Sequence, residues 1–568
     1  MATAVHRLFW LVSVLVNVCS GGELLHNGDL ESLDSWVCYK VHCEITTDHH
    51  CGHHSLKASQ RSSDGSGPGQ SFNATQGWLY MVTAWVKLLN DVPGKLGQPL
   101  SLMADYTFTD GHRHYDGVVD YPLAQKADGW IQLQAAFKAP NRAIKAAHMT
   151  IRGPDAAVDF LLDCASITNI WHGSGWRASA DKVIHDVRQS DVNIHVTTQG
   201  KLDKSNVQIQ VLQKKKSFPI GTVVNAWHYD DQKQSRYRSF IHDHFNWAVH
   251  ESTMKWKHIE PFEGRYHFEL PLRVLGALKK NGLKVRGHNL IWSTNVAVQD
   301  WVKHLSGDHL RNAVEHHITQ TMNQTRGKLE HWDVNNENLQ GQWYQERLND
   351  FNFELTPFRI AHHNDPHVKL FLNDYNIVAH GKMTGAYVAQ AERLKKANVG
   401  LYGLGVQCHF YNEEAPDPDL IKIRLDMLAK TGLPVWVTEF NIVAADENKR
   451  AEFVETAMRA FYGHPVVEGI LLWGFWDQSH SRGPHAALVK GDNLEMTAAG
   501  HRFLDLWENQ WMTDETRVLS KSGSQFTVRG FHGDYEVHVR YQGKDLGNLK
   551  QTFTLGETSH TVNINVHV

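Results

Sequence analysis

Hydrophobic and polar positions change their spacing twice along this chain of 568 residues. In residues 22–172, short runs of alternating apolar and polar residues, such as 78–86, are separated by turns rich in glycine, aspartate and proline. No long helical pattern interrupts them. Alternation with a period of two is typical of β-strands that are buried on one face. We therefore expect an all-β sandwich over residues 22–172.

From residue 218 onward, apolar runs of strand length alternate with segments of helical spacing. Helix signals between the runs include Asp417-Pro418 as a start and Gly432 as a stop. Repeated strand–helix units predict an α/β TIM barrel, (β/α)8, over residues 217–512, rather than a doubly wound sheet. The eight predicted strands are 218–224, 245–250, 283–291, 329–335, 368–374, 401–408, 434–439 and 467–475.

Three shorter segments complete the predicted organisation. Residues 1–20 have the pattern of a signal peptide, with Arg7 before an apolar core that is too short to span a bilayer. Residues 173–216 read as a charged linker with β-like runs, and residues 513–568 as a small β appendage packed on the barrel. No later run of about twenty apolar residues follows. The sequence therefore predicts a secreted, extracellular protein with no membrane partner.

Composition and charge narrow the function. The formal net charge is −4 and the isoelectric point is near 6.9, so no nucleic-acid partner is expected. Asn73 and Asn323 begin glycosylation triplets, which is consistent with secretion. The histidine-rich segment 48–54 resembles a metal cluster but lacks the paired spacing of zinc sites, so we expect a solvated loop and neither metal nor cofactor.

Five cysteines remain after residue 20. Four of them lie in the predicted sandwich and can pair as disulfides in an oxidising compartment, although the sequence leaves three pairings open. The fifth stands alone in the barrel. In order, they are Cys38, Cys43, Cys51, Cys164 and Cys408.

Two predicted barrel strands lead into glutamates. Glu337 follows one strand and Glu439 ends another about a hundred residues later. The C-terminal ends of barrel strands line the ligand site of this fold. Two carboxyl groups are the minimum for cleaving a glycosidic bond, one as acid/base and one as nucleophile. A single strand-end glutamate could equally cap the following helix, so the pair carries the argument.

The other strand ends carry amides, imidazoles and indoles. Amides and imidazoles hydrogen-bond hydroxyl groups, and indole faces cover the apolar side of a sugar ring, so the predicted ligand is neutral and hydroxyl-rich. No phosphate-binding loop or dinucleotide motif is present. Besides the two glutamates, the strand-end residues are Glu251, Lys255, Trp256, His288, Trp292, Asn336, Asn373, Asp374, Gln407, His409, Asn441, Trp473 and Trp476.

These motifs make the barrel resemble glycoside hydrolase family 10, in particular its animal and plant branch, whose members are mostly endo-β-1,4-xylanases. The resemblance implies that Glu337 is the acid/base and Glu439 the nucleophile of a retaining enzyme. Residues 22–172 resemble jelly-roll carbohydrate-binding modules, whose aromatic side chains either stack on sugars or fill the core. These candidates are Trp36, Trp85, Tyr106, Tyr115 and Trp130. The sugar-contacting positions implied in the barrel are Glu251, Lys255, His288, Trp292, Asn336, Gln407, His409 and Trp473, to which Trp476 is added.

Four residues depart from the family pattern. Ser252, Ser293, Asn441 and Ser481 stand where asparagine, histidine, aspartate and tryptophan are common. None of them removes a catalytic carboxylate. The resemblance therefore implies a retaining endo-β-1,4-xylanase whose partner is plant cell-wall polysaccharide, either xylan or cellulose. We expect this enzyme to be secreted and monomeric. Two alternatives stay open: an endo-acting β-1,4-glucanase or mixed-specificity β-glycanase with the same mechanism, and a non-catalytic polysaccharide-binding protein.

Overall fold

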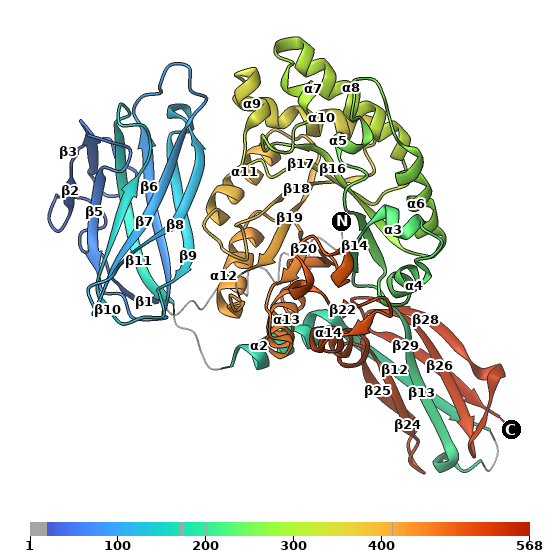
Figure 1. The fold of residues 1–568 in the computed structure, drawn as a ribbon. Coiled ribbons are helices and arrows are strands. Elements are labelled where there is room, and N and C mark those ends of the chain that lie inside the picture. The colour runs from blue at the N-terminus through green and yellow to red at the C-terminus, as the bar shows by residue number, and fades with distance from the viewer. Residues whose placement is uncertain (1–19, 171–174, 200–201, 412, 568) are drawn as a thin grey trace.

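The computed structural model describes residues 20–170, 175–199, 202–411 and 413–567. The chain forms an N-terminal β-sandwich, a closed barrel and a C-terminal two-sheet domain (Figure 1). The predicted signal peptide lies outside the described residues, apart from Ser20. None of the helices in the described ranges combines the length and the apolar character needed to cross a membrane.

The N-terminal sandwich confirms the all-β prediction. Its two antiparallel sheets enclose a core to which Tyr106 and Trp36 contribute, whereas Tyr115 keeps 51% of its surface exposed. Disulfides join Cys38 to Cys43 and Cys51 to Cys164. One sheet contains β1 (Ser20–Glu23), β3 (His42–Thr46), β4 (Ser55–Ser59), β6 (Leu79–Leu88), β9 (Trp130–Lys138) and β11 (Phe160–Ile170); the other contains β2 (Val37–Tyr39), β5 (Gly67–Phe72), β7 (Gln98–Phe108), β8 (Arg113–Ala124) and β10 (Ile144–Arg152).

The barrel is closed by eight parallel strands, and all eight predicted strands are present. Their residues are buried almost throughout because helices cover the outside and side chains fill the interior. The last strand ends at Leu472, before the predicted residue 475, and Gly474 beyond it has a φ of 115°. The strands are β14 (Ile220–Val224), β15 (Trp247–His250), β16 (Lys284–Trp292), β17 (His331–Asn336), β18 (Lys369–Asp374), β19 (Leu401–Phe410), β20 (Val435–Ile442) and β21 (Val467–Leu472).

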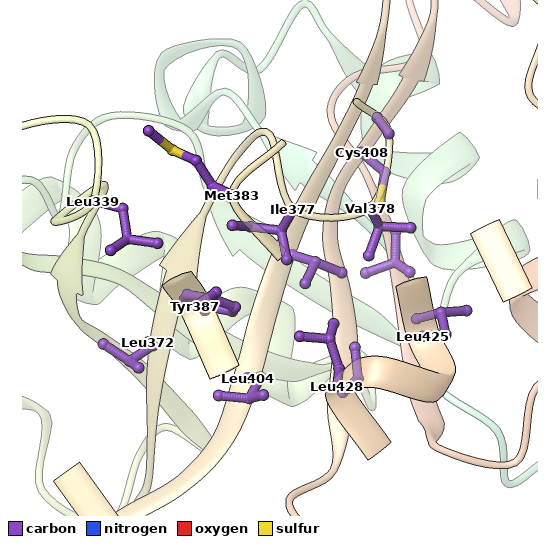
Figure 2. Packing of buried hydrophobic residues seen from close by; sticks show 14 of the residues in the cluster. Leu339, Leu372, Ile377, Val378, Met383, Tyr387, Leu404, Cys408, Leu425 and Leu428 are labelled. Carbon is purple, nitrogen blue, oxygen red and sulfur yellow. The ribbon is translucent and has the colours of Figure 1, made fainter. Parts of the chain in front are cut away.

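Apolar side chains join the helix layer to the barrel. Figure 2 shows Tyr387 and Leu425 from two of the helices in one buried cluster with Leu404 and the free Cys408 from β19. The helices are α3 (Ala226–Asp230), α4 (Ser235–His244), α5 (Trp256–Ile259), α6 (Glu269–Lys280), α7 (Asp300–Lys303), α8 (Gly307–Thr325), α9 (Trp343–Leu348), α10 (Leu355–Asn364), α11 (Thr384–Lys396), α12 (Pro418–Ala429), α13 (Glu447–Tyr462) and α14 (Ala498–Leu504); a short hairpin, β22 (Val489–Lys490) and β23 (Glu495–Met496), precedes α14.

The prediction of a linker over residues 173–216 is wrong. Its described residues form α2 (Trp176–Arg188), β12 (Gln189–Thr198) and β13 (Val207–Lys216), which pair with strands from the end of the chain. The predicted C-terminal appendage is therefore one part of a two-sheet domain with a core of its own. One sheet is completed by β25 (Gln525–Phe531) and β29 (His560–Val566), the other by β24 (Asp514–Val518), β26 (Gly533–Tyr541), β27 (Lys544–Asp545) and β28 (Gln551–Leu555).

The sandwich packs against helices α11 and α12 of the barrel (Figure 1). Arg424 of α12 is buried and donates a hydrogen bond of 3.0 Å to the carbonyl of Ala136 on β9. Lys382 lies 2.7 Å from the Asp120 carboxylate of β8. A small apolar cluster joins Leu79 and Ala136 of the sandwich to Leu420 of α12. The two units therefore share a packed interface.

Candidate active site

The two strand-end glutamates lie at the C-terminal end of the barrel. Glu337 directly follows β17 and adopts a left-handed backbone conformation with φ 55°. Its backbone N–H donates to the carbonyl of Asn373, 2.8 Å away on β18. Glu439 lies within β20 and is 5% exposed. The barrel thus fixes the backbone on which both carboxyl groups are mounted.

The Glu337 carboxyl group is held by two neutral donors. The Trp292 indole N–H donates to Oε2 at 2.7 Å, and the Gln407 amide donates to Oε1 at 3.2 Å. Burial and the negative charge of Glu439 raise the pKa of Glu337 above its ordinary value, although these two hydrogen bonds offset part of the rise. A raised pKa keeps this carboxyl group protonated at a higher pH than a solvated glutamate.

Glu439 has the opposite electrostatic setting. The Asn373 amide donates to Oε1 at 2.9 Å, and His409 Nε2 donates to Oε2 at 3.3 Å. Burial by itself would raise the pKa of Glu439, but the hydrogen bond from His409 and the nearby imidazole of His288 outweigh it and lower the pKa to about 2. This carboxyl group is therefore ionised under conditions in which Glu337 retains its proton.

A chain of amides connects the two carboxyl groups. Asn336 Oδ1 accepts a hydrogen bond from Asn373 at 2.9 Å and lies 3.5 Å from the Gln407 amide nitrogen. Since its oxygen is occupied, Asn336 presents its Nδ2 group as a donor, and this buried nitrogen has no partner among the residues that the structure describes. A hydroxyl group of a bound sugar is a suitable acceptor for it.

His288 and Lys255 complete the wall beside Glu439. His288 Nδ1 is hydrogen-bonded to Asp333 at 2.9 Å, so its Nε2 faces Glu439 Oε1 at 4.0 Å. The Lys255 ammonium lies 4.8 Å from the ring centre of Trp292 and 5.8 Å from that of Trp473. Burial lowers the pKa of Lys255, and the charge of Glu439 opposes this shift. The two indoles thus form aromatic surfaces next to the carboxyl groups.

The side chains of Glu251 and His409 are hydrogen-bonded to Asn225 and Asn441, to which the sequence analysis assigns no role in binding sugar. Asn225, directly after β14, donates to Glu251 Oε2 at 3.0 Å. The side-chain amide of Asn441 is hydrogen-bonded to His409 Nδ1. Asn225 was detectable as a polar residue at the end of the first strand. Asn373, by contrast, was recognised only as a strand-end amide, and its contact with both Asn336 and Glu439 depends on three-dimensional packing.

Trp476 was predicted to contact sugar, but its indole is buried in the protein. It is 3% exposed, its indole N–H donates to the Gly491 carbonyl at 2.9 Å, and its ring packs against Tyr237 and His228. Its polar atom and its faces are therefore occupied by the protein. Ser481, five residues later, is exposed. The remaining predicted site residues, from Glu251 to Trp473, lie at the C-terminal end of the barrel as expected.

The arrangement supplies acid–base and nucleophilic chemistry without a cluster suited to a metal ion. In the ranges that the structure describes, Cys51, Asp163 and Cys164 are the one group of potential ligands close enough to share an ion. Two of the three are joined in a disulfide in the sandwich, so their sulfurs are not available as thiolates.

Comparison with known proteins identifies the barrel. The protein-family model described as "Glycosyl hydrolase family 10" matches residues 209–503, just over half of the chain. The chain belongs to glycosyl hydrolase family 10. A second model, "Carbohydrate binding domain", matches residues 22–157, so the family 10 barrel is preceded by a carbohydrate-binding module.

Relatives of this family 10 chain include Endo-1,4-beta-xylanase 3 of Arabidopsis thaliana, 30% identical over 473 residues, with 81% of this chain and 60% of that protein covered. Anti-sigma-I factor RsgI6 of Acetivibrio thermocellus is 35% identical over 390 residues, with 69% of this chain and 50% of that protein covered. The chain thus spans about half to three fifths of the length of these relatives. Among solved structures, xylanase 10B from Thermotoga petrophila RKU-1 in complex with xylobiose is 24% identical, with a TM-score of 0.47, over 52% of this chain and 94% of that one.

Proposed function

We propose that this family 10 protein is a secreted, retaining endo-β-1,4-xylanase that hydrolyses internal bonds of plant xylan. The observation that carries the proposal is the opposed electrostatics of the two carboxyl groups: the pKa of Glu337 is raised, and that of Glu439 is lowered to about 2. Such a pair supplies one acid and one nucleophile at the same pH. The Arabidopsis relatives named endo-1,4-beta-xylanases support the choice of substrate.

In the proposed mechanism, ionised Glu439 attacks the anomeric carbon while Glu337 donates its proton to the leaving oxygen. A covalent glycosyl-enzyme results. Glu337, now ionised, then removes a proton from water, and the hydroxide attacks the same carbon and releases Glu439. Asn336, with its free Nδ2 donor, is placed to bind the sugar's 2-hydroxyl group, a contact that strengthens in the transition state.

A β-1,4-glucanase or mixed-specificity β-glycanase remains the second candidate because of one observation. Ser481 is exposed, and Trp476 is buried and bonded to the Gly491 carbonyl, so neither residue covers this side of the cleft with an indole. Glucose carries a hydroxymethyl group that xylose lacks. An uncovered subsite would accommodate this group.

The carbohydrate-binding module is proposed to bind the same polysaccharide through the outer face of the sheet β2–β5–β10–β7–β8. Tyr115 is half-exposed there, beside Asp105 on the neighbouring strand. Arg152 pairs with Asp105 at 3.2 Å and has a buried Nε without a partner in the part of the chain that is described. The absence of a side chain at Gly69 leaves His148 room at this surface, since a Cβ there would lie 2.6 Å from its Nε2.

Secretion is supported by the two disulfides of the module, which form and persist in oxidising compartments. Expression in a eukaryotic secretory host, followed by N-terminal sequencing of the product in the medium, tests this part of the proposal. A product retained in the cytosol with an intact N-terminus would contradict it.

The activity is tested by measuring reducing sugars released from xylan and from carboxymethyl cellulose. The Glu439→Gln variant serves as the control for contaminating activity. Internal cleavage of xylan by the parent enzyme, with little release from carboxymethyl cellulose, supports the xylanase. A preference for the glucan favours the second candidate, and no release from either polymer contradicts both.

A further inference from the structure

A cavity of about 410 Å³ lies at the opposite end of the barrel from the carboxyl pair. It is lined by residues at the N-terminal starts of the barrel strands, among them Trp247, Lys284, His331 and Lys369. The C-terminal domain contributes the other side, including Lys216 at the end of β13. This volume is within the range of small-molecule sites, about 300–1,000 Å³.

The charges around this cavity favour an anion. Lys284 and Lys369 form no ion pair with any residue in the described ranges; they lie 5.9 Å and 4.4 Å from the ring centres of Trp247 and Tyr402. With Arg188 and Lys216, four cationic side chains line the cavity, compared with the two carboxylates Glu330 and Glu468. A positive excess in a partly enclosed site attracts negatively charged ligands.

Two of the residues that line the cavity, Trp436 and Lys216, have buried donors without a hydrogen-bond partner in the described part of the chain. His331, which also lines the cavity, accepts a hydrogen bond at Nδ1 from Arg286 at 3.1 Å, so the neutral ring carries its proton on Nε2. Burial and the charge of Arg286 keep the pKa of His331 well below its ordinary value. The indole N–H of Trp436 is buried without an acceptor among the described residues. Buried donors without partners are costly, and an acceptor-rich ligand satisfies them.

Lys216 supplies the second of these donors. Its ammonium is buried, has no hydrogen-bond partner in the described part of the chain, and lies 3.8 Å from the ring centre of Trp507. Desolvation lowers the pKa of Lys216 to about 7. An anion in the cavity would stabilise its protonated form.

We propose that this cavity between the barrel floor and the C-terminal domain is a second ligand site, which binds a small organic carboxylate of the size of a sugar acid. The lysines and donor groups would bind the carboxylate and hydroxyl oxygens, and Trp247 and Tyr402 would contact the carbon skeleton. His331 and Glu337 lie at opposite ends of β17, so roughly 20 Å separates this site from the catalytic carboxyl groups. Occupation of one site therefore does not block the other.

The test is calorimetric titration of the full chain with D-glucuronate, D-glucose and inorganic phosphate. The variant Lys284→Gln/Lys369→Gln removes two of the charges that line the cavity, and Lys430→Gln, at an exposed lysine at the end of α12, is the matched control. We expect saturable glucuronate binding that weakens at least about tenfold in the double variant, because charged hydrogen bonds are lost, and is unchanged in the control. Binding should also weaken with added salt.

Glucose and phosphate separate the contributions of charge and of the carbon skeleton. Both should bind more weakly than glucuronate to the parent protein. Equal binding of glucose would overturn the role of the carboxylate, and equal binding of phosphate would overturn the role of the aromatic walls. Glucuronate binding that persists in the double variant would assign it to another surface, and the proposal would be wrong. Unchanged xylan hydrolysis in the double variant checks that it is folded.

Discussion

Replacing Trp292 by phenylalanine is predicted to extend activity to higher pH. The indole N–H donates to Glu337 Oε2 at 2.7 Å and favours the ionised form of this carboxyl group. Phenylalanine keeps an aromatic ring but cannot donate. A hydrogen bond to a charged group contributes about 1.5–3 kcal/mol, and one pKa unit corresponds to about 1.4 kcal/mol. The pKa of Glu337 should therefore rise by about 1–2 units.

The assay is the pH dependence of kcat/KM for a linear xylo-oligosaccharide, whose alkaline limb reports the proton on the general acid in the free enzyme. Because a higher pKa keeps Glu337 protonated to higher pH, Trp292→Phe should move this limb upward. Trp473→Phe is the matched control: it removes an indole beside the same Lys255 ammonium, but no hydrogen bond joins Trp473 to Glu337. An equal shift in both variants, or a downward shift for Trp292→Phe, would refute the assignment of Glu337.

Four further predictions follow from the same geometry. Glu337→Ala should lose polymer hydrolysis but still react with aryl glycosides, whose leaving groups need no acid; full activity on xylan would contradict its role. Asn373→Ala removes a donor from ionised Glu439, so its pKa should rise and the acid limb of kcat/KM should move to higher pH; an unchanged limb would count against this contact. Ser481→Trp should bind linear xylan more tightly than the parent by about 1–3 kcal/mol, by analogy with stacking on aromatic side chains, which lowers KM, and it should discriminate against glucans; a uniform loss of activity on all substrates would indicate a clash instead. The fragment 22–172 should fold and be retained on insoluble xylan or cellulose; soluble fragment without retention would disprove binding.

The barrel was predictable from the sequence because its strands are buried on both faces. Runs such as 434–439 are apolar almost throughout and lie between helical segments with clear start and stop residues. The prediction of residues 173–216 failed for the opposite reason. Strand β13 pairs with β26, whose residues lie more than 300 positions later. Such non-local pairing leaves only a weak alternating pattern in the local sequence.

The site was predictable to a similar degree. The C-terminal ends of parallel strands converge, so Glu337, Glu439 and their polar neighbours were expected together, and the structure brings them together. The role of Asn373 depends on which way an amide points, which is set by the Thr438 hydroxyl that donates to its oxygen at 2.5 Å. Trp476 was misassigned because the sequence shows that a tryptophan is present but not whether its indole is buried in the protein or faces the sugar.

The central claim is that Glu439 forms a covalent bond to the sugar, and trapping that intermediate tests it most directly. A 2-deoxy-2-fluoro-β-xylobioside with a good leaving group forms the glycosyl-enzyme but releases it slowly, because the fluorine destabilises the oxocarbenium-like transition state. Mass spectrometry of the digested protein should find one added fluoroxylobiosyl group on the peptide that contains Glu439, and none in Glu439→Gln. A label on Glu337, or xylan hydrolysis with no labelled peptide, would contradict the account.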